Sequence, residues 1–283
     1  MSEAATTTAA AAEHAPAGGE FDVGAHIMHH ILDSNSIEVP FTSYEIHLPQ
    51  IHVGKFDLSI TRNVVMMWIA CAILLALFVT AGRRAKKGGV PKGLTNALEA
   101  MVLYVRNEIA RKTIDPHYAD RYVGYLCTAF FFILACNLLG MIPGLSTPTS
   151  SISVTATLAA FTFVISQAGG IRNYGVLGHF KNLVPPGLPV AILPVILVVE
   201  IISMLARPFA LAIRLFANMT AGHVVIISLI SLIFVLKSVL VAGMSVPFAL
   251  FVYTLEILVA FLQAFIFTML SSLFIGLAVH PSH

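Results

Sequence analysis

The chain has 283 residues, of which 58% are hydrophobic and only 11% are charged, and its formal net charge is +2. Its mean hydropathy is +0.88. Soluble domains carry roughly 25% charged residues, so this composition excludes an ordinary soluble enzyme. It predicts an all-α polytopic membrane protein.

The N-terminal region is polar and acidic. We expect residues 1–20 to be a disordered tail and residues 21–63 to be an external segment that precedes one membrane domain over 64–283. The start has neither a basic nor an apolar region of the kind that marks a secretory signal. A cluster of histidines is compatible with a metal site or with a solvated segment: His26, His29 and His30. We favour the solvated segment, and no cofactor is expected.

The first predicted span covers residues 64–81, and basic residues follow it at once. Nine of the sixteen Lys and Arg residues lie between positions 83 and 121. The positive-inside rule therefore predicts that this loop is cytoplasmic and that the N-terminus is outside. Within the loop, residues 94–112 carry apolar side chains at helical spacing. This pattern predicts an amphipathic helix on the inner membrane surface, or alternatively a helix packed on a soluble partner.

Two further ordinary spans are predicted at residues 122–142 and 152–168, because no charged residue occurs from Tyr122 to Ile171. The loop over 143–151 would join them outside the membrane. Residues 169–189 would then form an inner loop.

The last third of the chain does not fit ordinary spans. Apolar sequence covers residues 188–236 and 245–279, with Gly243 and Pro247 predicted to form the turn between them. As helices these segments would be about 70 Å and 50 Å long, whereas the hydrocarbon core is about 30 Å thick. We predict a hairpin of two long, steeply tilted membrane helices with a cytoplasmic C-terminus.

Polar residues in this hairpin are few, and several fall at helical repeats: Glu200, Arg207, Arg214, Asn218 and His223, then Glu256 and Gln263. Seven residues turn a helix by about 700°, close to two full turns. Glu200, Arg207 and Arg214 therefore share one face, and Asn218 lies near it. Glu256 and Gln263 are also seven residues apart, so they share one face of the second helix. His223 should point to a different surface from Arg214.

Arg214 is the most informative of these residues because its guanidinium keeps its charge at any physiological pH. A cation at membrane depth costs at least about 3 kcal/mol. Ion pairs that only hold helices together are the alternative explanation. Two face-aligned rows of polar groups in so apolar a segment favour a route for ions or protons.

Three motifs resemble subunit a of F-type ATP synthases over residues 40–280. They are Arg214-Leu215-Phe216-Ala217-Asn218-Met219, Gln263-Ala264-Phe265-Ile266-Phe267 and Asn137-Leu138-Leu139-Gly140-Met141-Ile142-Pro143-Gly144. The resemblance implies a proton-translocating stator, which is not an enzyme by itself.

The resemblance also implies partners and a location. The partners would be a rotating c-ring, peripheral-stalk b subunits, membrane lipid and protons, with no nucleic acid. The location would be the bacterial inner membrane rather than an organellar one.

Residue roles follow from the same resemblance. Arg214 would face the ring carboxylate and separate two offset half-channels, with Asn218 and Gln263 beside it. Glu200 would belong to the inner half-channel, and Arg207 occupies a position that is often basic.

The chain departs from many bacterial members in two places. His223 and Glu256 stand where those members carry an acid and a histidine, as in the mitochondrial type, so a working outer pair is retained. The loop over 147–153 lacks the Asp and Asn that many bacterial members carry there. Hydroxyl groups and water would then replace the missing acid near residues 150–153.

Two other function classes predict different sequence features. A secondary transporter predicts paired internal repeats, and an intramembrane hydrolase predicts a metal or nucleophile cluster such as His-Glu-x-x-His. The sequence contains neither. It also lacks a P-loop, so nucleotide chemistry would belong to partner subunits. The choice of proton or sodium would depend on c-ring ligands.

Overall fold

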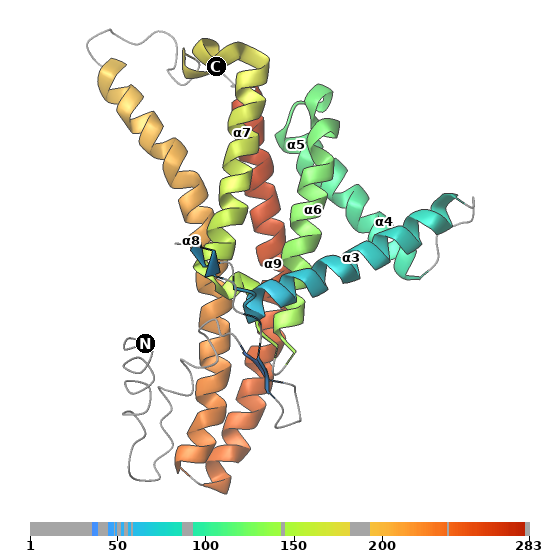
Figure 1. Ribbon diagram of the computed structural model, residues 1–283, viewed down its shortest axis with the longest axis vertical. Helices are drawn as coiled ribbons and strands as arrows, with labels where there is room; N and C mark the ends of the chain where they lie inside the picture. The colour runs from blue at the N-terminus through green and yellow to red at the C-terminus, as the bar shows by residue number, and fades with distance from the viewer. Residues whose placement is uncertain are drawn as a thin grey trace.

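The computed structural model describes residues 36–38, 45–47, 49, 52–53, 56–57, 59–86, 93–142, 145–181, 193–236 and 238–280 (Figure 1). The predicted tail over 1–20 and the cluster His26, His29 and His30 lie outside these residues. In the described part, five helices are long and apolar enough to cross a membrane. This confirms the number of spans expected from the sequence.

Two short β-ladders precede the helices and are a local exception to the predicted all-α fold. β1 (Ser36–Glu38) pairs antiparallel with β2 (Glu45–His47), with Ile37 opposite Ile46. β3 (His52–Val53) pairs in the same way with β4 (Phe56–Asp57). Strands of two or three residues are too short to show an alternating pattern in the sequence.

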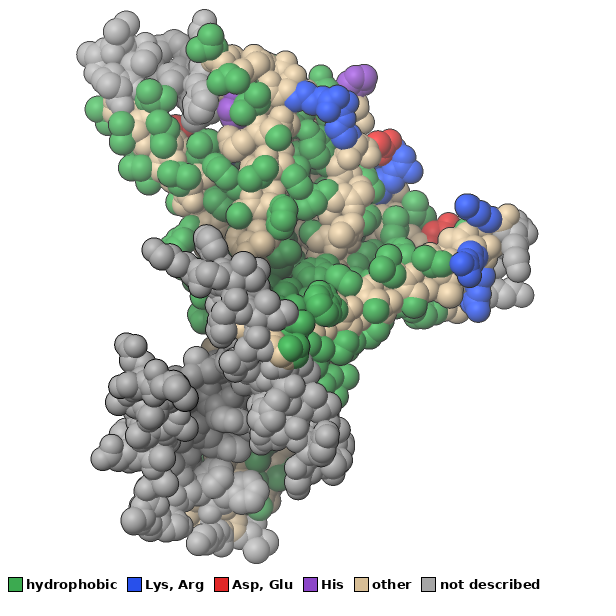
Figure 2. Space-filling model, viewed as in Figure 1, with side chains coloured by type: hydrophobic (Ala, Val, Ile, Leu, Met, Phe, Trp, Pro, Cys, Tyr) green, Lys and Arg blue, Asp and Glu red, His purple; other side chains and the backbone are tan. Residues whose placement is uncertain are grey.

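α3 (Arg62–Lys86) and α4 (Leu94–Tyr104) form an arm that projects from the other helices (Figure 1). α3 is longer than the expected span 64–81 at both ends. Its last turn carries Arg83, Arg84 and Lys86, which are exposed. Figure 2 shows basic side chains at the tip of this arm and apolar side chains spread over much of the described surface in this view.

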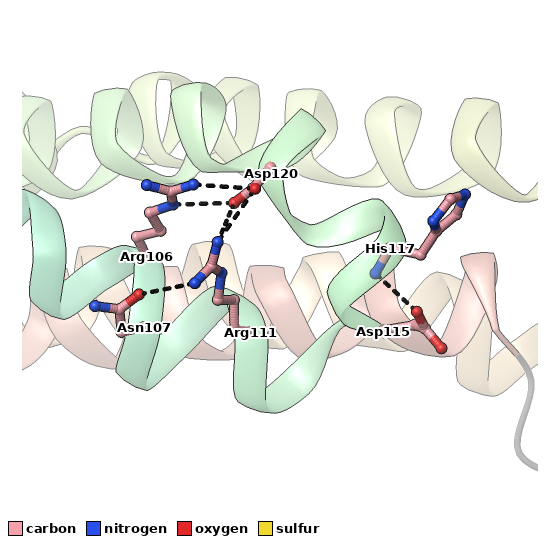
Figure 3. A network of polar contacts seen from close by, with 6 residues as sticks. All are labelled: Arg106, Asn107, Arg111, Asp115, His117 and Asp120. Atoms are coloured by element: carbon pink, nitrogen blue, oxygen red, sulfur yellow. Dashed lines mark hydrogen bonds and ion pairs between the residues drawn. The ribbon is translucent and has the colours of Figure 1, made fainter.

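The helix expected over 94–112 is interrupted by a π-helical turn, η1 (Val105–Ala110), which leads into α5 (Arg111–Thr113). Such turns are uncommon. This one buries Val105 and Ile109 against the core. Its outer side is tied to the next helix by a charged cluster (Figure 3).

In that cluster both oxygens of the Asp120 carboxylate accept hydrogen bonds from Arg106 at 3.0 Å, and Arg111 adds a contact at 3.2 Å. The hydrogen bond to Asp120 raises the pKa of the Arg106 guanidinium. Because these side chains are exposed, their ion pairs add little to the stability of the fold. Their effect is to hold η1 and α5 against the start of α6.

α6 (Pro116–Gly140) begins with Asp115, whose side chain accepts from the backbone N–H of His117 at 2.9 Å, and with Pro116 in the first turn. A short 3-10 turn, η2 (Pro148–Ser150), precedes α7 (Ile152–Lys181). α7 runs well beyond the predicted end at residue 168 and is broken only at Gly175, where φ is 71°.

Two glycines explain why that predicted end was wrong. The sequence predicts a loop that starts at Gly169 and Gly170, but both residues lie inside α7. A Cβ at 169 would come within 2.6 Å of the Tyr122 hydroxyl, and one at 170 within 2.3 Å of the His179 ring. The glycines therefore permit close helix packing instead of ending the helix.

α8 (Leu193–Leu236) and α9 (Val239–Val279) are the two longest helices and lie side by side along the lower half of Figure 1. Their 44 and 41 residues correspond to about 66 Å and 62 Å. The turn falls between Leu236 and Val239, so the prediction of a turn at Gly243 and Pro247 was wrong. Both residues lie within α9. Membrane helices tolerate Gly and Pro because neighbouring groups satisfy the freed backbone.

Candidate functional site

A histidine and a glutamate meet between α8 and α9. The Nδ1 atom of His223 lies 2.6 Å from Oε1 of Glu256, and the Glu256 side chain is only 4% exposed. His223 is 13 residues before the end of α8, and Glu256 is 17 residues after the start of α9. The two helices are therefore staggered by about one turn at this level.

The other ring nitrogen of His223 faces the chain that joins α6 to α7. Its Nε2 atom lies 2.8 Å from Oγ1 of Thr147 and 3.1 Å from the backbone oxygen of Gly140. Thr147 immediately precedes η2 and is almost completely buried. Four segments thus converge on one imidazole: the end of α6, the η2 turn, α8 and α9.

Two glycines make this convergence possible. A Cβ at position 222 would lie 2.7 Å from Oε1 of Glu256, so Gly222 lets the carboxylate approach the backbone of α8. A Cβ at position 140 would lie 1.8 Å from Oγ1 of Thr147. Neither polar side chain could occupy its position beside a larger residue.

Polar contacts around the imidazole hold the connecting segments in place. The Thr149 hydroxyl donates to Asn137 Oδ1 at 2.6 Å, and Asn137 donates to the backbone oxygen of Ala260 at 3.2 Å. The Tyr253 hydroxyl donates to the backbone oxygen of Met141 at 2.9 Å. The end of α6 and the η2 turn are therefore anchored to α9 on either side of Glu256.

Arg214 lies on the exposed side of α8. The buried face of the helix carries Leu211, Ala212, Leu215 and Met219, and Arg214 lies outside this face. Within the residues that the structure describes, Arg214 has neither a hydrogen bond nor an ion-pair partner. An uncompensated guanidinium thus faces outward from an apolar helix.

An amide pair lies one helical turn beyond Arg214. Asn218 Nδ2 donates to Gln263 Oε1 at 2.7 Å and connects the exposed side of α8 to α9. Gln263 is 1% exposed, and its Nε2 atom has no partner among the described residues. Among the described residues, Asn218 is thus the one partner of the Gln263 amide.

On the other side of Arg214, Glu200 Oε1 accepts from Arg207 at 3.2 Å, as the seven-residue spacing predicted for a shared face. The Arg207 guanidinium also lies 5.9 Å from the centre of the Phe274 ring. A cavity of about 20 Å³ adjoins Arg207, with Thr162, Ser166 and Gln167 among its lining. A cavity of this size has room for one water molecule, and its lining combines these polar groups with apolar side chains such as Met204 and Phe274.

The family described as ATP synthase A chain matches residues 64–276. The chain is also 51% identical to ATP synthase subunit a 2 of Prosthecochloris aestuarii, over 97% of this chain and 85% of that protein. It is 50% identical to ATP synthase subunit a of Chloroherpeton thalassium, over 90% and 77% of the two chains. For ATP synthase subunit a of an Anaeromyxobacter species the identity is 44%, over 96% and 76%.

The chain belongs to the ATP synthase subunit a family. All seven residues singled out from the sequence lie within the segment that the family matches. The structure joins six of them into three pairs, namely Glu200 with Arg207, Asn218 with Gln263, and His223 with Glu256. In this family member Arg214 stays apart from all three pairs.

Sequence reasoning missed Thr147, Gly140 and Gly222 in this subunit a homologue. The stretch over 147–153 is rich in hydroxyl groups, but its pattern does not show which hydroxyl faces His223. The glycines gave a weak signal, because an isolated Gly in a helical segment often has a packing reason.

Proposed function

We propose that this chain is the proton-translocating stator subunit of an F-type ATP synthase. In this proposal the chain forms two offset half-channels against a rotating c-ring, and Arg214 lies between them. The observation that carries the proposal is the isolation of Arg214, an exposed cation on a long apolar helix with paired polar groups on both sides. The names of its relatives, ATP synthase subunit a, agree with it.

The chemistry follows from charge and solvation. A carboxyl group on a partner helix is neutral while it faces lipid, because desolvation disfavours its charged form. When rotation brings it to Arg214, the cation favours the ionised form, and the proton leaves. The fixed charge also repels a proton that would cross directly between the half-channels. Each proton that moves through 100 mV supplies about 2.3 kcal/mol.

The two half-channels are assigned by position along α8. His223 and Glu256 would line the outer one, about 14 Å beyond Arg214 along the helix axis. Glu200, Arg207 and the cavity beside Phe274 would line the inner one. Asn218 and Gln263 would hold the surface next to Arg214.

The location and the partners are part of the same proposal. The basic tip of α3 would lie in the cytoplasm under the positive-inside rule, which puts the N-terminus outside and the C-terminus inside a bacterial inner membrane. α8 and α9 would lie steeply tilted against the c-ring, because both are about twice as long as the membrane core is thick. Peripheral-stalk b subunits would contact the chain elsewhere.

The test is the loss of the charge at position 214. We expect Arg214→Ala to abolish ATP-driven proton pumping by the complete enzyme in reconstituted vesicles while assembly persists. Arg214→Lys should fail as well, because an ammonium group lacks the planar fork and loses its proton more readily when buried. Normal pumping by the assembled Arg214→Ala enzyme would refute the proposal.

A further inference from the structure

The loop that lacks the expected acid still delivers one polar group to the outer pair. Thr147 is 1% exposed, and its hydroxyl lies 2.8 Å from His223 Nε2. The neighbouring hydroxyls are engaged elsewhere, since Thr149 bonds to Asn137 and Ser150 to the backbone oxygen of Thr147. Among the described residues of this loop, Thr147 is therefore the one whose side chain meets the imidazole.

We infer that Thr147 is the positioning residue of His223 and that, together with the Gly140 carbonyl, it gives Nε2 a partner in both protonation states of the ring. The inference rests on the proposed function, because it deepens the role of the outer pair. The Thr147 hydroxyl would then serve in place of the acidic side chain that many bacterial members carry in this loop.

The argument begins with the opposite nitrogen. An ionised carboxylate can only accept hydrogen bonds. The Glu256 carboxylate, 2.6 Å from Nδ1, therefore holds the proton of a neutral imidazole on Nδ1. Nε2 then carries a lone pair and needs a donor. The Thr147 hydroxyl supplies that donor, whereas the Gly140 carbonyl cannot.

The requirement reverses when the ring takes up a proton from water. The new proton sits on Nε2, which now donates, and the Nδ1 proton stays with Glu256. The Thr147 hydroxyl rotates and accepts, and the Gly140 carbonyl at 3.1 Å is a second acceptor. Release of the proton to water restores the first state. Serine and threonine hydroxyls can fill both roles because they donate and accept.

The surrounding structure is built to keep the hydroxyl in place. Gly140 leaves the space that Oγ1 occupies, as a Cβ there would also come within 2.7 Å of the Thr147 backbone. The Thr147 backbone oxygen accepts from Ser150, which closes the η2 turn at 2.8 Å. The Thr220 hydroxyl on α8 reaches the backbone of the same turn. Among the described residues, Glu256 is the one titratable side chain bonded to His223.

The experiment compares Thr147→Val, which keeps the shape and removes the hydroxyl, with Thr147→Ser, which keeps the hydroxyl. The complete ATP synthase is reconstituted in vesicles, and passive and ATP-driven proton flux are measured across pH for equal amounts of assembled complex. We expect Thr147→Val to lower the flux by about 3- to 10-fold, the value of one hydrogen bond. The pH at which its flux is half-maximal should also move. Thr147→Ser should retain both properties.

Thr155→Val is the matched control, because it removes an equally buried hydroxyl, at the start of α7, that bonds to the backbone oxygens of Ser151 and Ile152 and not to His223. It should leave the pH of half-maximal flux unchanged. If Thr147→Val does not assemble, Thr147→Ala carries the same expectation with more space. The inference is overturned if the variant without the hydroxyl matches the wild type, if Thr147→Ser loses as much flux, or if Thr155→Val shows the same pH change.

Failure of this inference is distinguishable from failure of the proposed function. If assembled Arg214→Ala still pumps protons, the proposed function is refuted. If Arg214→Ala is inactive but Thr147→Val keeps the wild-type flux and pH profile, only the role of Thr147 is refuted.

Discussion

At the scale of single residues, Gly222 decides whether the buried carboxylate can meet the imidazole. A methyl group at this position would lie 2.7 Å from Oε1 and 3.0 Å from Cδ of Glu256. We expect Gly222→Ala to displace the carboxylate and to lower proton flux by about tenfold or more, as expected when a proton-transfer group is misplaced. The measurement is proton flux in reconstituted vesicles per assembled complex.

The control is the same substitution at Gly243 on α9, where a Cβ would meet no atom within 4 Å. Alanine favours a helix interior by up to about 1 kcal/mol over glycine, so Gly243→Ala should assemble and conduct as the wild type does. Equal flux in the two variants would show that the approach of Glu256 to α8 is irrelevant to conduction.

Much of the site at this scale was predictable from residue spacing. The seven-residue repeat placed Glu200 with Arg207 on one face, and the structure joins them directly. The contact of Thr147 with His223 was not predictable, because it joins residues 76 positions apart in the chain. Local sequence fixes which side of a helix a residue occupies, but not which loop later covers that side.

At the scale of elements, the inclination of α8 is a prediction that crosslinking can check. Exposed alanines follow the Arg214 side of the helix: Ala210, Ala217 and Ala221. If α8 runs obliquely across the ring wall, cysteines there should crosslink to successive c-subunit helices at similar depths. An upright α8 would instead give crosslinks to one c-subunit helix at increasing depth.

The crosslinking needs a background in which Cys71, Cys127 and Cys136 are replaced. Ala212→Cys is the matched control, because Ala212 lies on the same helix and is 4% exposed. It should form no crosslink to the ring. Efficient crosslinking from position 212 would mean that the opposite side of α8 faces the partner.

The helices themselves were largely predictable because long apolar runs are a strong signal. The structure departs from the prediction where Gly and Pro would be expected to end a helix. Pro247 remains inside α9, and Gly169 remains inside α7. The π-turn over Val105–Ala110 was also missed, since its apolar residues fit an ordinary helix equally well.

At the scale of the whole molecule, the orientation in the membrane can be tested from two positions. Ser238 lies in the turn between α8 and α9, and Lys86 lies exposed at the end of α3. We expect Ser238→Cys to react with a membrane-impermeant thiol reagent in spheroplasts, and Lys86→Cys to react in inverted vesicles. The same cysteine-free background serves both, and the reverse pattern would overturn the proposed orientation.

The isolation of Arg214 also bears on how the chain enters the membrane during synthesis. A single cation on an emerging apolar helix opposes insertion by about 3 kcal/mol or more, and no described residue of the chain compensates it. We therefore expect a newly made copy to draw water or lipid headgroups toward this residue until the proposed ring partner covers it. The charge proposed to drive rotation would thus destabilise an unassembled copy in the bilayer. Completed assembly would remove that free-energy cost.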